Sequence, residues 1–208
     1  MPKRRTDRVL EGLDAAIHES FGALANEIRP HMERAFRARA KEQAAALGMR
    51  VDPERLDQLA SGYSELRAKE LEKQLRDNTP HLLEPIIETA LAEHWDDARL
   101  ESEIADSRAF GLSRAITIDR TETTISRQAA SEAVGQAAEA DEKSWTINFD
   151  DACELCQENA AASWIEASGD FPNEMHTGCR CDVIYRMSAD EDERKGEEET
   201  GEGDEAEA

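Results

Sequence analysis

All four cysteines of this chain fall in two tight pairs, and a histidine stands just before the second pair. These five side chains are Cys153, Cys156, His176, Cys179 and Cys181. Thiolate and imidazole groups at such spacings are typical ligands of zinc, and paired cysteines also form disulfides. The pattern therefore leaves three interpretations open: a structural zinc site, free or buried thiols, and disulfides.

The composition bears on the choice between a metal and disulfides. The first twenty residues carry charges at positions where a secretory signal would be apolar, and no stretch reaches the roughly 18 apolar residues of a transmembrane helix. We therefore expect a protein that is made in the cytoplasm and has no membrane partner. Thiols are kept reduced in that compartment, which favours a metal site over disulfides.

A closed structural zinc site takes four ligands in a tetrahedron, and the sequence offers five donors. Two residues between paired cysteines is a common zinc spacing, whereas a single residue is less usual. We expect Cys153, Cys156 and Cys181 to bind the metal. His176 and Cys179 then compete for the fourth position. The sequence thus predicts zinc as a structural cofactor.

Two stretches that alternate apolar and polar residues flank this cluster, at 143–149 and 181–187. Such alternation predicts short β-strands. A two-stranded sheet is marginal on its own in water, so the module needs a cross-link, a metal or an adjoining helix. We therefore expect a β-hairpin or two-stranded sheet that a metal ion staples together.

The chain before this module has the apolar spacing of helices. Apolar residues from Leu10 to Ile28 recur at steps of three and four, until Pro30 interrupts the pattern. A second helix begins at Asp52–Pro53, where a capping residue precedes a proline of the first turn. We expect this helical part to break again at Pro80 and to restart with Pro85 in a first turn.

The second helix carries an apolar stripe that is the candidate surface for a partner. Its members are Leu56, Leu59, Tyr63 and Leu66. Two heptads are fewer than a coiled coil needs, so packing within the chain and binding to a partner helix both remain open.

A further helix is expected between residues 119 and 140, with Asp119 as its cap and Glu122 as the partner in a capping box. The fold class is therefore α+β. A mainly helical, partner-binding region covers residues 1–108, and the module with the cysteine cluster covers 109–187. An acidic tail follows at 188–208.

The charge of the chain is strongly negative and unevenly distributed. The 47 acidic and 25 basic residues give a formal net charge of −22, and residues 188–208 hold 11 acidic and 2 basic residues. We expect this tail to be disordered. The net charge opposes a general attraction to nucleic acid, although basic residues at 3–8 and 34–41 would allow local contact with DNA. We therefore assign no nucleic-acid-binding residues.

The order of several motifs along the chain resembles a known family. The segments "DRTET", "KSWTINFDDACELCQENA" and "FPNEMHTGCRCDVIYRM" follow one another between about residues 109 and 187. In this order they resemble the C-terminal domain of the phage Mu protein F-like family, the minor head or head morphogenesis proteins of tailed phages. The residues that carry the resemblance are Arg120, Thr121, Glu122, Trp145, Asp151, Cys153, Cys156, His176, Cys179, Arg180 and Cys181. Relatives commonly have a proline-rich approach to the histidine, where this chain has only Pro172.

The resemblance implies a low-copy protein of the virion interior, present in the host cytoplasm during assembly. Such a protein associates with the portal protein, and with the scaffold or major capsid protein as further candidate partners. It assists procapsid assembly, genome packaging or delivery. Amphipathic helices that offer a partner-binding face are compatible with this function.

Enzymes are the rival class of function. In a zinc-supported nuclease His176 would act on a phosphodiester, with Glu174 as the nearby carboxylate in the sequence. The family fold has also been compared with ADP-ribosyltransferase toxin domains, which would make Arg120 and Glu122 catalytic. A surface arginine and a helix-capping glutamate explain these two residues more simply. We therefore expect no enzymatic activity and assign no catalytic residues.

Overall fold

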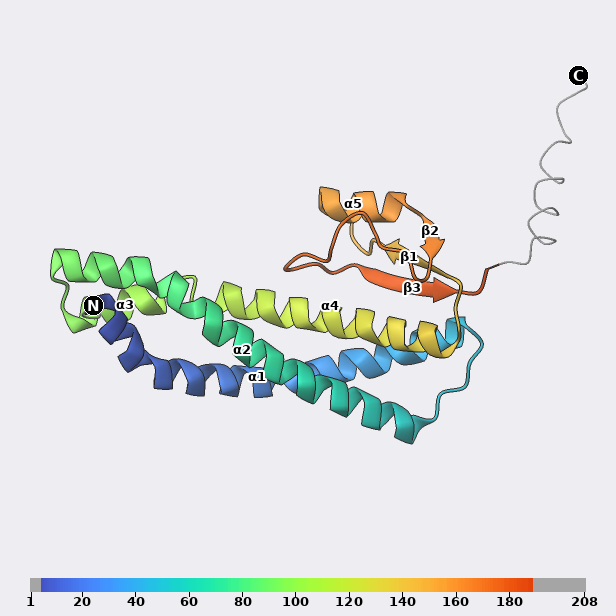
Figure 1. Ribbon diagram of the computed structural model, residues 1–208, viewed down its shortest axis with the longest axis horizontal. Coiled ribbons are helices and arrows are strands. Elements are labelled where there is room, and N and C mark those ends of the chain that lie inside the picture. The colour runs from blue at the N-terminus through green and yellow to red at the C-terminus, as the bar shows by residue number, and fades with distance from the viewer. Residues whose placement is uncertain (1–4, 189–208) are drawn as a thin grey trace, which may run out of the picture.

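The computed structural model describes residues 5–188, with side chains from residue 20 onward. Its framework is a pair of long antiparallel helices, α1 (Arg5–Ala46) and α2 (Pro53–Glu93), with α4 (Leu112–Ala137) packed along them (Figure 1). The short helix α3 (Asp97–Ala105) lies at one end of this framework, and a small sheet with helix α5 (Glu154–Ala161) lies toward the other end. The predicted α+β class, mainly helical with a small C-terminal sheet, is confirmed.

Helix α1 continues through Pro30, so the prediction that this proline interrupts the helix was wrong. Proline removes one backbone hydrogen bond and costs about 3 kcal/mol inside a helix. The buried residues Ile28, Met32 and Phe36 continue one apolar stripe on both sides of the proline. Their packing outweighs the local cost.

Helix α2 begins where the sequence predicted. The Asp52 carboxylate accepts a hydrogen bond from the Glu54 backbone N–H at 3.0 Å, and Pro53 occupies the first turn. The predicted breaks at Pro80 and Pro85 were wrong, because α2 runs through both prolines. Buried side chains continue at steps of three and four along the whole helix, so tertiary packing again decides its length.

Helix α4 begins at Leu112 after the capping position of Gly111, so the predicted cap and capping box were wrong. The Asp119 carboxylate instead contacts the His31 ring of α1, and Asp119 Oδ1 lies 2.9 Å from His31 Nδ1. Glu122 is 3% exposed and forms a two-pronged ion pair with Arg67 of α2. Both acids therefore join α4 to another helix, Asp119 at the surface and Glu122 in the interior.

The sheet has three antiparallel strands, one more than the predicted pair. Strand β1 (Glu142–Thr146) overlaps the predicted stretch 143–149 but begins one residue earlier and ends at Thr146. Strand β3 (Asp182–Arg186) lies within the predicted stretch 181–187, and β2 (Trp164–Glu166) is the additional strand. The order is β2-β1-β3, with Lys143 of β1 opposite Ile165 of β2 and Tyr185 of β3. The central strand therefore hydrogen-bonds on both edges.

Helix α4 connects the two predicted regions, because it packs against α1 on one side and against β3 on another (Figure 1). Gly135 allows this contact, since a Cβ there would lie 2.5 Å from the Tyr185 ring. Helix α1 also reaches the outer edge of β3. Arg39 donates to the Val183 carbonyl at 3.0 Å, and the Gln43 amide binds the Tyr185 backbone at both its C=O and its N–H.

The predicted acidic tail lies outside the described residues, apart from Ser188. In the described part of the chain, no helix combines the length and the apolar character that a membrane crossing requires.

Candidate metal centre

The structure brings all five predicted donors together at one end of the module. Cys153 is the residue that caps α5, and Cys156 lies in the first turn of that helix. His176, Cys179 and Cys181 lie on the irregular segment that leads into β3. Helix α5 lies on the side of the sheet away from α1 and α2 (Figure 1), whereas this segment is hydrogen-bonded to α4.

The distances between these donors are close to those of a tetrahedral zinc site. His176 Nε2 lies 3.0 Å from Cys153 Sγ and 3.2 Å from Cys156 Sγ. Cys156 Sγ lies 3.6 Å from Cys179 Sγ. Two sulfurs bound to one zinc at 2.3 Å in a tetrahedron are about 3.8 Å apart. The separation of Cys156 and Cys179 is thus close to that of two sulfurs on one zinc ion.

The donors form two overlapping groups, one of Cys153, Cys156 and His176 and one of Cys156, Cys179 and Cys181. Within each group the ligand atoms lie within 4.8 Å of one another. Cys156 belongs to both groups and is therefore the donor that they share. All four cysteines are free thiols, so no disulfide uses these sulfurs.

The local backbone fixes the orientation of two donors. With Nε2 facing the sulfurs, the other ring nitrogen of His176 can donate to the Thr177 carbonyl, 3.0 Å away. Such a contact fixes the tautomer and the plane of a metal-binding imidazole. The Cys181 backbone N–H donates to Cys179 Sγ at 3.4 Å, which favours a thiolate at Cys179.

Helix α4 holds the ligand segment at 176–181, which carries three of the donors, through hydrogen bonds. The Thr124 hydroxyl donates to the Cys179 carbonyl at 2.6 Å, and the Gly178 N–H donates to the Thr121 hydroxyl at 2.8 Å. Gly178 has a φ of +78°, which a residue with a side chain rarely adopts. The helix and this turn together position Cys179 toward Cys156.

An ion pair next to the cluster was not predicted from the sequence. Both Asp182 oxygens accept from Arg127 of α4 at 2.8 Å, and Asn148 donates to the same carboxylate at 3.1 Å. Burial alone would raise the pKa of Asp182, but the Arg127 hydrogen bonds and charge outweigh it and lower the pKa. The pair ties β3 to α4 immediately after Cys181. The sequence signal was only an acid that follows the last cysteine.

Burial raises the pKa of the Cys156 and Cys179 thiols. Both thiols are therefore protonated at neutral pH when the ion is absent. A metal ion that binds them must displace their protons, as thiolate ligands generally require.

Arg120 and Glu122, which would be catalytic in an ADP-ribosyltransferase, do not form a shared site. Arg120 is exposed on α4, whereas the Glu122 carboxylate is buried against Arg67 at 2.6 and 2.8 Å. Arg180, another residue of the resemblance, pairs with Asp151 at 2.8 Å and stacks on Phe149, with the guanidinium 3.8 Å from the ring centroid. Glu122 and Arg180 thus make contacts that hold the fold.

The candidate partner stripe of α2 divides between two environments. Leu56 is 3% exposed and packs among side chains of α1 and α4, and the Tyr63 ring lies 5.1 Å from that of Phe36. Leu59 and Leu66 face solvent, at 52% and 70% exposed. Leu56 and Tyr63 therefore pack within the chain, and of the four residues only Leu59 and Leu66 are open to a partner.

Three comparisons with known proteins were made for this chain. No family model, no curated protein and no solved structure matches it.

Proposed function

We propose that this chain is a minor head protein of a tailed phage, which associates with the portal protein inside the procapsid. There it assists assembly, genome packaging or delivery. Its place is the virion interior, and before that the host cytoplasm. The scaffold and the major capsid protein are further candidate partners.

The observation that carries this proposal is the convergence of several of the residues on which the family resemblance rests. They are spread from residue 120 to residue 181 in the sequence. Thr121 on α4 nevertheless holds Gly178 of the ligand segment, and Cys156 lies against His176 and Cys179. If the motifs resembled the family only by chance, there would be no reason for them to lie together in the fold. If they belong to a domain of that family, their contact is expected.

We further propose that the centre holds one structural zinc ion through Cys153, Cys156, His176 and Cys179. Sulfur and imidazole donors in a closed set suit zinc, which fixes a tetrahedron without redox chemistry. Cys179 is preferred to Cys181 as the fourth ligand because its sulfur lies 3.6 Å from Cys156 and accepts a backbone N–H. The ion would join α5 to the segment before β3.

The partner surface is centred on Leu59 and Leu66. They lie seven residues apart on α2 and therefore on one face of the helix. Exposed leucines at this spacing suit a groove or a helix of the portal protein.

The test is co-purification of the chain with assembled portal rings. The double change Leu59→Glu and Leu66→Glu should abolish retention, because it places two charges in an apolar contact. The matched control, Gln58→Glu with Gln74→Glu, also adds two negative charges at exposed positions of α2 and should leave retention unchanged. Normal retention of the leucine double variant, with its helical circular dichroism intact, would reject this partner surface.

A further inference from the structure

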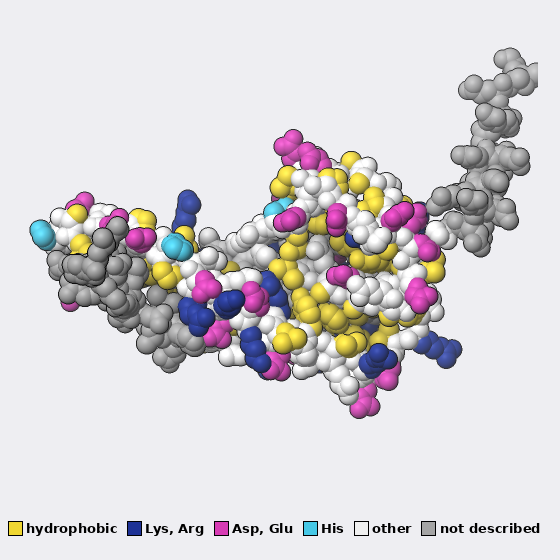
Figure 2. All heavy atoms as spheres, in the orientation of Figure 1, with side chains coloured by type: hydrophobic (Ala, Val, Ile, Leu, Met, Phe, Trp, Pro, Cys, Tyr) yellow, Lys and Arg dark blue, Asp and Glu magenta, His cyan; other side chains and the backbone are white. Residues whose placement is uncertain are grey.

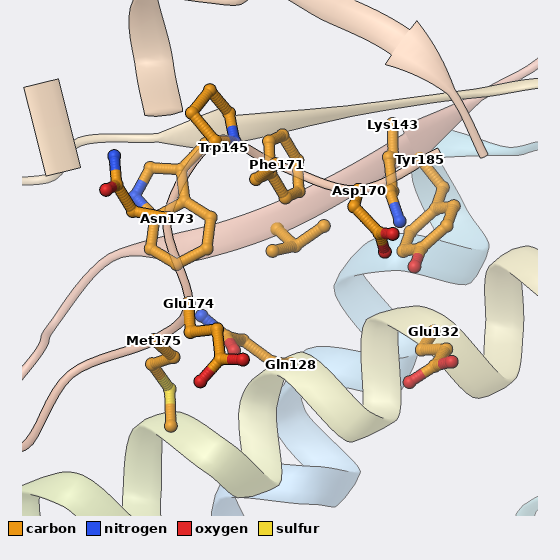
Figure 3. Close-up of a pocket in the computed structure, with 12 residues that line it drawn as sticks. Gln128, Glu132, Lys143, Trp145, Asp170, Phe171, Asn173, Glu174, Met175 and Tyr185 are labelled. Carbon is orange, nitrogen blue, oxygen red and sulfur yellow. The ribbon is translucent and has the colours of Figure 1, made fainter. Parts of the chain in front are cut away.

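A cavity separate from the metal centre lies between the sheet, α4 and the loop at 170–175 (Figure 3). Its volume is about 570 Å³, which is within the range of small-ligand pockets. None of the five metal donors lines it. Nothing in the proposed head function requires this cavity.

One wall of the cavity is aromatic. Figure 3 shows Trp145 and Phe171 close together on the side of the sheet, with Tyr185 farther along the same wall. The rings of Trp145 and Phe171 meet edge to face, with their centroids 5.3 Å apart. Aromatic faces attract cations, and they also bind the apolar stem of a long side chain.

Three carboxylates surround this wall, namely Glu132 of α4 and Asp170 and Glu174 of the loop side. Within residues 20–188, none of the three has an ion-pair partner, and Glu132 accepts only from Gln136 at 3.1 Å. The single cation of the lining, Lys143, has its ammonium group 5.4 Å from the Phe171 ring centroid. Three negative charges against one positive charge make the cavity a site for a cation.

The pKa of the Tyr185 hydroxyl is consistent with a negatively charged cavity. Burial and the negative charge of Glu132 raise the pKa of Tyr185 to about 12. The carboxylate of Glu132 therefore acts on the interior of the cavity and not only on solvent. A cation bound beside Tyr185 would feel the same negative potential.

The cavity wall also contains a hydrogen-bond donor without a partner. Trp145 is 5% exposed, and its indole N–H has no acceptor among the residues that the structure describes. A buried donor without a partner costs about 1–3 kcal/mol, so an acceptor brought by a ligand would be favourable. The nitrogen itself is covered, and an acceptor would reach it through a small shift of the loop at 170–175, which has no helix or strand.

We propose that this cavity binds an arginine side chain of a basic peptide segment on a partner protein. The guanidinium would stack on the aromatic wall and pair with Glu132 and Glu174. Arginine suits such a site better than lysine, because its planar group stacks on rings and binds carboxylates with two parallel hydrogen bonds. A backbone carbonyl of the same peptide would accept from Trp145, which a free cation without a carbonyl could not do.

The test uses the full chain and the peptide acetyl-Gly-Gly-Arg-Gly-Gly-amide. The indole N–H resonance of Trp145 is identified in a ¹H–¹⁵N spectrum by its loss in Trp145→Phe. We expect the peptide to shift this resonance, and to leave those of Trp95 and Trp164 in place. An unchanged Trp145 resonance at saturating peptide would overturn the proposal.

Charge controls separate this site from general attraction to an acidic protein. Glu132→Gln and Glu174→Gln should each weaken binding about tenfold, the cost of a lost charge-assisted hydrogen bond. Glu88→Gln removes the same charge at an exposed position of α2 and should have no effect. Equal binding of a citrulline peptide, or equal weakening by Glu88→Gln, would contradict the site. Agmatine has the guanidinium but no carbonyl, so it can stack on the aromatic wall but cannot accept from the indole. It should therefore shift the Trp145 resonance less than the peptide does, and an equal shift by agmatine would exclude the peptide carbonyl.

Discussion

At the scale of single residues, the candidate metal centre has one donor more than a tetrahedral ion requires. Cys156 belongs to both donor groups, whereas Cys181 belongs only to the group with Cys156 and Cys179. Both cysteines are 2% exposed, so a serine at either place disturbs packing to a similar extent. They are therefore a matched pair for deciding which sulfur binds.

We expect Cys156→Ser to lose its bound metal and to unfold the module, and Cys181→Ser to retain about one equivalent of metal. The reason is that structural zinc supplies on the order of 10 kcal/mol to small modules of this kind. Metal analysis of protein purified under reducing conditions measures both variants. Equal loss of metal from the two would refute our choice of ligands.

A count of reactive thiols distinguishes the metal from disulfides. Thiols bound to a metal become reactive once the ion is chelated, whereas a disulfide gives none until it is reduced. All four cysteines should therefore react after chelation without a reductant.

At the scale of elements, α4 is the helix on which the rest is assembled. It contacts α1 along one face, and its residues Thr121, Thr124 and Arg127 hold the segment around the last two cysteines. The side chains of α1 cover the outer edge of β3, which would otherwise expose unpaired backbone groups. The sheet is thus stabilised by two helices in addition to any metal.

The contact between α4 and β3 can be tested with one methyl group. Gly135→Ala should destabilise the protein by about 1–3 kcal/mol, because its Cβ would overlap the Tyr185 ring. Gly62→Ala is the control, since this glycine of α2 has no atom within 4 Å of a new Cβ. It should stabilise the protein by up to about 1 kcal/mol through helix propensity. Urea denaturation measures both, and stabilisation by Gly135→Ala would mean that the helix and the strand pack less closely.

At the scale of the whole molecule, the metal centre and the long helical pair are held by different interactions. The bundle has its own buried clusters, one around Met32 and Leu83 and another around Phe36 and Leu56. The module has a separate cluster around Trp145 that includes three of the cysteines. Removal of the ion should therefore act mainly on the module.

We expect chelation to raise amide hydrogen exchange in peptides from residues 142–187, and to leave most of α1 and α2 protected. Ligand binding stabilises only the unit that holds the ligand, here the small sheet and α5. Hydrogen exchange followed by mass spectrometry measures each segment separately. Loss of protection along α2 to the same extent as in the module would show that the chain unfolds as one unit.

Much of this fold and of its candidate site was determined by the sequence, where the signal is local. The cap at Asp52 and the alternation that predicts β1 and β3 depend on neighbours a few residues apart. The two cysteine pairs are local as well. Each needs only one turn to present its sulfurs, so their meeting between the start of α5 and the segment before β3 was predictable.

Only the tertiary structure decided the features that depend on distant partners. Helices continue through Pro30, Pro80 and Pro85 because buried stripes on both sides outweigh one lost hydrogen bond at each proline. The three-residue strand β2 is too short to give a pattern, and it exists because β1 supplies its hydrogen bonds. Glu122 has the spacing of a capping residue, but Arg67, fifty-five positions away, makes it an ion pair within the bundle. Rules based on neighbouring residues could not predict this ion pair, because the interactions that fix the position of Glu122 form only when the chain is folded.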